Sequence, residues 1–239
     1  IIGLPLKVGD LLLNVAVVLQ KGKILGVIPK TYLPNYGEFY EKRWFASSQD
    51  LRPTEVVIAD QKLLISAKPK LFSTASGVLF GIEICEDVWA PIPPSNRLTL
   101  SGADIIFNLS ASDELIGKHN YLKSLLSQQS ARTICGYIYS GSGFGESTQD
   151  LVFGGNALIY ENGRLIASGK RFSLESQMVT TQIDVEMLRS ERRDNTTYIN
   201  AQRSSELGIE QIDIIPCLER EINVFELERA IDPHPFIPT

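Results

Sequence analysis

Short runs of apolar and β-branched residues recur through the first two-thirds of the chain, each bounded by glycine, proline or serine. Runs of this length with such boundaries are typical of β-strands, whereas an amphipathic helix needs apolar residues three or four positions apart. The pattern predicts strands at 14–20, 24–29, 55–59, 62–66, 77–84, 103–109 and 134–140.

One segment follows a helical period instead. Between Glu114 and Thr133, leucines and a tyrosine recur at spacings near three and four without a proline, which predicts an amphipathic helix. Asp113 stands where a side chain would cap its first turn. Further along, two strand-like runs within 154–169 flank Asn162-Gly163, a dipeptide that favours a tight β-hairpin.

Strands, an intervening helix and a hairpin together predict a mixed sheet in an α/β or α+β domain. We expect this domain to cover residues 1–193 and to end in a short helix at 185–193, whose RSERR sequence is interpreted as a solvated basic helix end. From 194 to 239 the apolar period is weak, and the last nine residues contain three prolines. There we expect an extended arm that leads toward a further domain, absent here.

Composition and charge narrow the possible functions. The 239 residues are 44% hydrophobic, enough for one sizeable core, and a net charge of −5 with interspersed signs argues against a nucleic-acid surface. The longest apolar stretch, at 11–19, is too short to span a bilayer. Three widely spaced cysteines without a CxxC pair suggest neither disulfides nor a metal site, and they fit a cytoplasmic protein.

The strand-like run at 77–84 leads into Cys85, which two carboxylates and a tryptophan follow soon after. A free cysteine usually packs as a small buried hydrophobic residue. A strand exit is also where a nucleophile is well held, because the sheet fixes its direction and the next loop supplies N–H groups. A thiolate needs a base or a cation nearby.

Three residues are candidates to assist this thiol. His119 on the expected helix and His234 in the proline-rich tail are both interpreted as solvated histidines. Lys30 lies in an aromatic-rich loop directly after a strand, which is typical of a pocket wall, and a neighbouring ammonium lowers the pKa of a thiol. Lys30 is therefore the favoured partner of Cys85.

Four long segments, in this order, resemble a known family: PKTYLPNYGEFYEKRWF (29–45), GIEICEDVWAPIPPS (81–95), NLSASDELIGKHNY (108–121) and GFGESTQDLVFGGNALIYENGRLIASGKRF (143–172). They are similar to the glutamine amidotransferase domain of glutamine-dependent NAD synthetases, a branch of the nitrilase superfamily. The resemblance covers about residues 11–172 and implies a nitrilase-like αββα four-layer sandwich. It also implies a Glu–Lys–Cys triad that hydrolyses the side-chain amide of glutamine to supply ammonia.

The resemblance implies a role for several residues. Cys85 resembles the nucleophile that forms the glutamyl thioester, and Lys30 resembles the triad lysine, which stabilises the oxyanion with the backbone N–H of Glu86. Glu41 resembles a second glutamate that supports this lysine. The residues expected to hold the amino acid end of glutamine are Tyr36, Glu86, Ser112 and Lys118, where Lys118 stands at a position that carries arginine in some relatives.

Part of the family's chemistry has no counterpart in these residues. The family's base is a glutamate upstream of the lysine, yet the only carboxylate before Lys30 is Asp10. We therefore expect an N-terminally truncated domain with an impaired active site. The Gly-rich GSGFGE (141–146) lacks the spacing of a phosphate loop.

The resemblance also sets the expected partners. No cofactor or metal is expected in this chain, and ATP and Mg²⁺ are expected to belong to the absent synthetase domain. Expected partners are glutamine, that domain and further copies of the chain, without nucleic acid or membrane. Two alternatives stay open: a free-standing carbon–nitrogen hydrolase acting on another amide or nitrile, and a non-catalytic remnant module.

Overall fold

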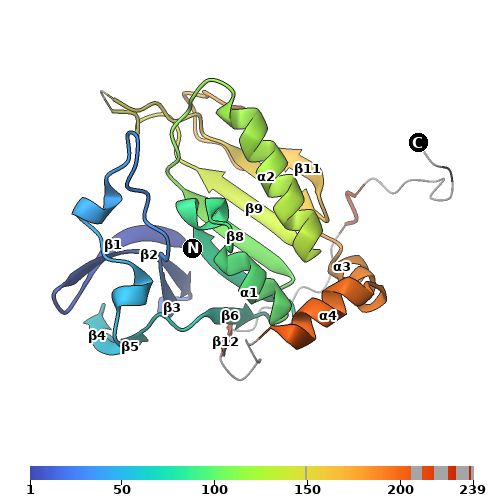
Figure 1. The fold of residues 1–239 in the computed structure, drawn as a ribbon, viewed down its shortest axis with the longest axis horizontal. Coiled ribbons are helices and arrows are strands. Elements are labelled where there is room, and N and C mark those ends of the chain that lie inside the picture. Colours follow the sequence, from blue (N-terminus) through green and yellow to red (C-terminus); the bar gives the residue numbers. More distant parts are fainter. Residues whose placement is uncertain (149, 206–211, 218–225, 230–236, 238–239) are drawn as a thin grey trace.

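The computed structural model describes residues 1–148, 150–205, 212–217, 226–229 and 237. Its centre is a mixed seven-stranded sheet with the order β11-β10-β9-β8-β7-β6-β12 (Figure 1). The middle strands β7, β8 and β9 are parallel, so their carboxyl ends meet at one edge of the sheet. The strands are β6 (Lys70–Ser73), β7 (Leu79–Ile84), β8 (Ile105–Ser110), β9 (Gly136–Gly141), β10 (Ala157–Glu161), β11 (Arg164–Ser168) and β12 (Asp213–Pro216).

A second, three-stranded antiparallel sheet packs on one face of the large one. It contains β1 (Ile2–Val8), β2 (Leu11–Gln20) and β3 (Lys23–Pro29). Successive residues of a strand point to opposite faces. On β2, Ala16 and Val18 accordingly join Ile82 of the large sheet in one core cluster, whereas Val15 and Val17 belong to another.

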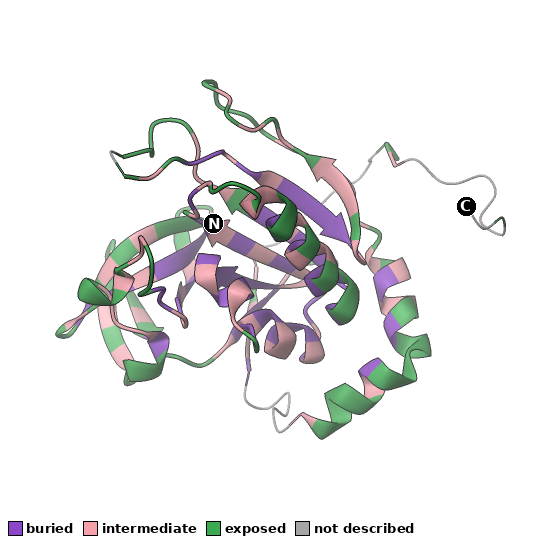
Figure 2. Ribbon diagram, turned by 45° about the horizontal axis from the view of Figure 1, so that its top comes forward, coloured by how far each residue is buried: buried purple, intermediate pink, exposed green. Residues whose placement is uncertain are grey.

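Two helices cover the other face of the large sheet, α1 (Pro94–Leu100) and α2 (Lys118–Thr133) (Figure 1). Their apolar residues Leu98, Leu122 and Leu126 pack with Ile106 of β8 and Tyr137 of β9 in the main core. Figure 2 shows a largely buried sheet beneath the exposed outer side of α2. Within the described part of the chain, no helix is both long and apolar enough to cross a membrane.

The layers are therefore α, β and β. The outer face of the small sheet is covered by the hairpin of β4 (Thr54–Ile58) and β5 (Gln61–Ile65), where Ile65 and Leu51 pack against Val15 and Val17. The expected α/β class is confirmed. Of the four expected layers, the described residues form three, because a β-hairpin and short 3-10 turns occupy the face where a second helical layer was expected.

All seven strands expected from the apolar runs are present, with shifted ends, and the hairpin turn is confirmed. Asn162 and Gly163 have φ angles of 44° and 84°, the left-handed pair that a tight hairpin turn requires. Strands β1, β6 and β12 were not expected. β1 contains Gly3 and Pro5, which disfavour a strand, but it is an edge strand of its sheet, where proline is tolerated.

The long helix begins later than its period predicted. Residues 114–117 form a loop in which the N–H of Glu114 donates to the carbonyl of Val152, and Gly117, with φ of 81°, is the N-cap of α2. Asp113 does not cap the helix, so that prediction is wrong. Its carboxylate accepts a hydrogen bond from Nζ of Lys118 at 2.5 Å instead.

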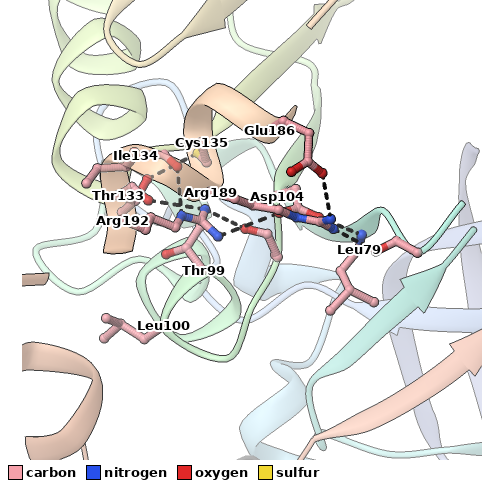
Figure 3. Close-up of polar contacts among 12 residues, drawn as sticks. Leu79, Thr99, Leu100, Asp104, Thr133, Ile134, Cys135, Glu186, Arg189 and Arg192 are labelled. Carbon is pink, nitrogen blue, oxygen red and sulfur yellow. Dashed lines mark hydrogen bonds and ion pairs between the residues drawn. The ribbon is translucent and has the colours of Figure 1, made fainter. Parts of the chain in front are cut away.

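Two arginines near the end of α3 (Val185–Asp194) bind groups of the main domain instead of being solvated (Figure 3). Arg189 donates to both carboxylate oxygens of Asp104, at 3.0 and 2.8 Å. Arg192 is buried and donates to the carbonyls of Ile134 and Ala103 at 2.9 and 2.7 Å. Because Asp104 is buried, these arginines compensate its charge, and the solvated interpretation is wrong for both of them.

The prediction of an extended arm at 194–239 is wrong for several of the described segments in that range. Residues of α4 (Thr196–Ser204) are helical, with Asn195 capping the first turn through the N–H of Tyr198. β12 pairs in parallel with β6, and Arg229 donates to both carboxylate oxygens of Glu161 at 2.5 Å. The division of the chain at residue 193 remains a prediction, and His234 and the proline-rich segment around it lie outside the described residues.

Candidate active site

A cavity of about 710 Å³ opens where β7, β8 and β9 end. Loops after the carboxyl ends of parallel strands are a common location of ligand sites. The large sheet supplies Cys85 after β7, Ser110 and Ala111 after β8, and Ser140, Gly141 and Ser142 around the end of β9. Asn14 and Lys30 come from the small sheet, and Glu41 comes from the aromatic-rich loop. The cavity therefore forms between the two sheets.

Cys85 occupies a strained turn at the exit of β7. Its φ of 48° lies in the left-handed region that residues with a side chain rarely adopt. Its N–H donates to Oδ1 of Asn108 at 3.1 Å. Burial raises the pKa of the thiol, while Lys30, the hydroxyl of Ser110 and the N–H of Ala111 favour the thiolate. Burial thus opposes ionisation of the thiol, and these three groups counteract part of that effect.

Lys30 lies directly after β3 and is only 3% exposed. Its N–H donates to the carbonyl of Asn14 at 2.9 Å, and its Nζ donates to Oε2 of Glu41 at 2.5 Å. The other carboxylate oxygen of Glu41 accepts from Nδ2 of Asn14 at 2.8 Å. A buried ammonium needs such a counter-charge, which the carboxylate of Glu41, itself fixed by Asn14, supplies.

Asp87 joins the turn at Cys85 to the loop that follows Lys30. Its Oδ2 accepts from the N–H of Ile84 at 2.9 Å, and its Oδ1 accepts from the N–H groups of Thr31 and Tyr32 at 3.2 and 2.8 Å. Burial raises the pKa of this carboxyl to about 6, against the opposing effect of these hydrogen bonds. One buried side chain therefore fixes the loops that carry Cys85 and Lys30 relative to each other.

Two of the expected substrate-binding residues pair beside the cavity. Oη of Tyr36 donates to Oε1 of Glu86 at 2.6 Å. The ring of Tyr36 meets Phe39 edge-on, with centroids 6.1 Å apart, and Phe39 lines the cavity. Tyr36 is 60% exposed, so its hydroxyl and the carboxylate of Glu86 are accessible from solvent.

The other two come from the segment between β8 and α2 and the start of that helix. Nζ of Lys118 is 5.5 Å from the centroid of the Phe39 ring and pairs with Asp113 at 2.5 Å. Ser112 is half-buried and directly follows Ala111, which lines the cavity. The structure thus brings Cys85, Lys30 and Glu41 into one cavity, whereas none of the four expected binding residues lines it.

Sequence reasoning missed several polar residues of this region. Asn14 interrupts the apolar run LLLNVAVVL, and Asn108 interrupts IIFNL. A polar residue inside a buried strand needs a hydrogen-bond partner, so these interruptions were a usable signal. Asp87 gave no comparable signal, because two of its three backbone partners lie 55 and 56 positions away in the sequence. The interpretation of His119 as solvated is also wrong: it is half-buried, and burial lowers its pKa.

Comparison with known proteins gives a consistent result, although no family model matches the sequence. The chain is 36% identical to the glutamine-dependent NAD(+) synthetase of Mycobacterium leprae. The match covers the whole of this chain and 35% of that protein. The solved glutamine-dependent NAD(+) synthetase of Cytophaga hutchinsonii is similar with a TM-score of 0.64 and 27% identity, over 74% of this chain and 28% of that one. A nitrilase-superfamily member of Saccharomyces cerevisiae shares the fold, with a TM-score of 0.58 and 15% identity over 81% and 62% of the two chains.

The α/β layers share the fold of nitrilase-superfamily structures, and a cysteine, a lysine and a glutamate meet in a cavity at the sheet edge. The sequence similarity is more specific than the fold. Over its whole length the chain is similar to glutamine-dependent NAD(+) synthetases, and it spans 35% of the length of the curated relatives that it matches.

Proposed function

We propose that this chain is the glutaminase domain of a glutamine-dependent NAD synthetase. The observation that carries the proposal is the strained, buried Cys85 in one cavity with the Lys30–Glu41 ion pair. A lysine that is buried at a cavity wall and paired with a half-buried glutamate is well placed to stabilise an oxyanion. The resemblance of this chain to glutamine-dependent enzymes supplies the substrate class.

The proposed reaction is an amide hydrolysis through a thioester. Sγ of Cys85 loses its proton and attacks the side-chain carbonyl carbon of glutamine, and the resulting oxyanion is stabilised by Lys30 and the N–H of Glu86. The C–N bond then breaks, and the nitrogen takes up the proton that the thiol lost. Ammonia departs, and a glutamyl thioester remains on Cys85. Water cleaves this thioester to glutamate and restores the thiol. The amino acid end of glutamine is held by Tyr36, Glu86, Ser112 and Lys118.

These steps require a base for the thiol and for water. Asp10, the only carboxylate before Lys30, is exposed in the turn between β1 and β2. Glu41 is engaged by Lys30 and Asn14, which suits support rather than proton transfer. We therefore propose no base among the described residues, and we expect covalent capture of an electrophile by Cys85 to be easier than repeated turnover.

The released ammonia would amidate nicotinic acid adenine dinucleotide to NAD in a synthetase domain. In this proposal, ATP and Mg²⁺ would act in that domain. We place the protein in the cytoplasm, where this product is used. Homo-oligomers remain part of the proposal, and the exposed Val57 and Leu64 of the β4–β5 hairpin are a candidate contact surface.

A substrate comparison tests the proposal against the two alternatives. Ammonia release would be measured with glutamine, other amides and nitriles, for the unaltered chain, Cys85→Ala and the control Cys217→Ala. We expect release from glutamine that Cys85→Ala abolishes and Cys217→Ala leaves unchanged. Faster release from another amide or a nitrile would favour a free-standing hydrolase. Ligand binding without either release or labelling of Cys85 would favour a non-catalytic module.

A further inference from the structure

A chain of three buried side chains begins at Glu83 and ends at the backbone N–H of Cys85. Glu83 on β7, Asn108 on β8 and Tyr137 on β9 are each at most 1% exposed. Oη of Tyr137 donates to Oε1 of Glu83, and Nδ2 of Asn108 donates to Oη of Tyr137 at 3.1 Å. Oδ1 of Asn108 then accepts the N–H of Cys85 at 3.1 Å. The chain of hydrogen bonds crosses the three parallel strands whose ends form the cavity.

The carboxylate at one end sets the direction of every bond. Oε2 of Glu83 accepts the N–H of Ser95 at 2.8 Å, so both oxygens of the carboxylate accept. Tyr137 has one hydroxyl hydrogen, and because it donates this to Glu83, it presents only a lone pair to Asn108. Asn108 must therefore turn its NH₂ group toward Tyr137 and its carbonyl toward Cys85.

This orientation has two consequences at the active site. An oxygen facing the N–H of Cys85 stabilises the left-handed turn, which a residue with a side chain rarely adopts. The same bond engages the N–H of Cys85, which leaves the N–H of Glu86 as the neighbouring donor for an oxyanion. Reversal of the Asn108 carboxamide would instead set an NH₂ group against an N–H.

We propose that Glu83, Tyr137 and Asn108 are positioning residues that hold Cys85 in the conformation in which its thiol reacts in the cavity. This inference rests on the proposed function, in which Cys85 is the nucleophile. The three residues touch neither substrate nor thiol, and they act only through the backbone N–H of Cys85.

The test is the rate at which iodoacetamide alkylates Cys85, followed by peptide mass spectrometry at about pH 8.5, above the pKa of about 7 of Glu83. Tyr137→Phe removes the hydroxyl and keeps the ring. Glu83→Gln keeps the shape of the side chain but can accept from only one of Ser95 and Tyr137. Both variants are expected to slow alkylation of Cys85 about tenfold.

A matched control lies on the neighbouring strand. Tyr160 of β10 pairs in register with Tyr137 and is equally buried in the same core cluster, but its hydroxyl has no hydrogen-bond partner among the described residues. Tyr160→Phe removes a hydroxyl from the same core and is expected to leave the alkylation rate of Cys85 unchanged.

The other two cysteines act as references within each sample. Cys135 is fully buried and reports opening of the fold, whereas the half-buried Cys217 reports the concentration of reagent. If Tyr137→Phe makes Cys135 accessible to the reagent, the fold has opened, and the alkylation rate of Cys85 in the more conservative Glu83→Gln variant is used instead. Unchanged Cys85 labelling in folded variants would overturn the positioning role. Labelling of the unaltered Cys85 that excess glutamine does not slow would instead contradict the proposed function.

Discussion

At the scale of single residues, the site depends on buried charges that are paired rather than solvated. Lys30 and Glu41 form one such pair between the sheets, and Asn14 holds the second oxygen of Glu41. Breaking a buried ion pair by removing one partner is costly, because the remaining charge keeps its desolvation penalty. The pair is therefore expected to matter for stability as well as for the reactivity of Cys85.

Glu41→Gln tests this pairing. The variant leaves the buried ammonium of Lys30 without its counter-charge, and the free energy of unfolding is expected to fall by about 3 kcal/mol in chemical denaturation. Glu38→Gln is the control, because Glu38 lines the same cavity but forms no ion pair within the described residues. Equal losses for the two variants would contradict a specific role of the pair.

Glu83 gives stability a pH dependence. Burial raises its pKa from 4.5 to about 7, so the folded protein binds this proton more tightly than the unfolded chain does. Ionisation of Glu83 therefore costs stability, and this cost grows as the pH rises through that window. The free energy of unfolding is expected to fall by up to roughly 3 kcal/mol from Glu83 alone.

Thermal or chemical unfolding between pH 4 and pH 8 measures this contribution. Glu83→Gln carries no titrating group and should flatten the decline, whereas Glu55→Gln on the exposed side of β4 should reproduce the unaltered profile. A Glu83→Gln profile parallel to that of the unaltered chain would show that Glu83 is ionised at its ordinary pKa.

The residues of the site were only partly predictable from sequence. Cys85 was indicated by its place at a strand exit and Lys30 by its aromatic loop, while the positions of Glu41 and Tyr36 came from the family resemblance. The contacts of Asp87 and of the Glu83 chain join residues far apart in sequence. Their partners are set by strand order, which no local pattern reveals.

At the scale of elements, the spacing of apolar residues predicted whether a segment is a helix or a strand better than it predicted where the element begins and ends. Apolar runs gave the inner strands because burial on one or both faces leaves a direct mark on sequence. The start of α2 was missed because the loop at 114–117 contains two apolar residues that continue the leucine pattern, although both are exposed. β12 and α4 were missed because both are short, and tertiary contacts rather than propensity stabilise them.

Arg192 tests how α3 is held. Its guanidinium satisfies backbone carbonyls beyond the last turn of α2 and beside Asp104, so Arg192→Ala leaves buried acceptors without donors. The free energy of unfolding is expected to fall by about 2 to 3 kcal/mol. Arg193→Ala removes the exposed neighbour on the same helix and should change stability by less than about 0.5 kcal/mol. Similar values for both would mean that α3 is not anchored through Arg192.

At the scale of the whole molecule, the proposed active site lies where two sheets meet. Cys85 comes from the large sheet and Lys30 from the small one, with Asp87 joining their loops. The sequence predicted most strands of both sheets, though not β1, β6 or β12, and it did not predict which sheet each strand would join. That assignment depends on which faces are buried together.

Gly26 of β3 tests the spacing between the sheets. A Cβ at this position would lie 2.9 Å from Cζ of Phe72 on β6, closer than packing allows. Gly26→Ala should therefore displace the sheets, lower the free energy of unfolding by about 1 to 3 kcal/mol and slow the labelling of Cys85. Gly3→Ala on β1, whose Cβ would meet Leu109 at an ordinary 3.9 Å, is the control. Unchanged labelling in Gly26→Ala would show that the site tolerates a shift between the sheets.

The central claim is that Cys85 is the nucleophile of a glutamine pocket. Its most direct test is the intact mass of the protein before and after exposure to 6-diazo-5-oxo-norleucine, an electrophilic analogue of glutamine. We predict one adduct, blocked by excess glutamine, absent in Cys85→Ala and retained in Cys217→Ala. No adduct on the folded chain, or an adduct that persists in Cys85→Ala, would contradict the claim.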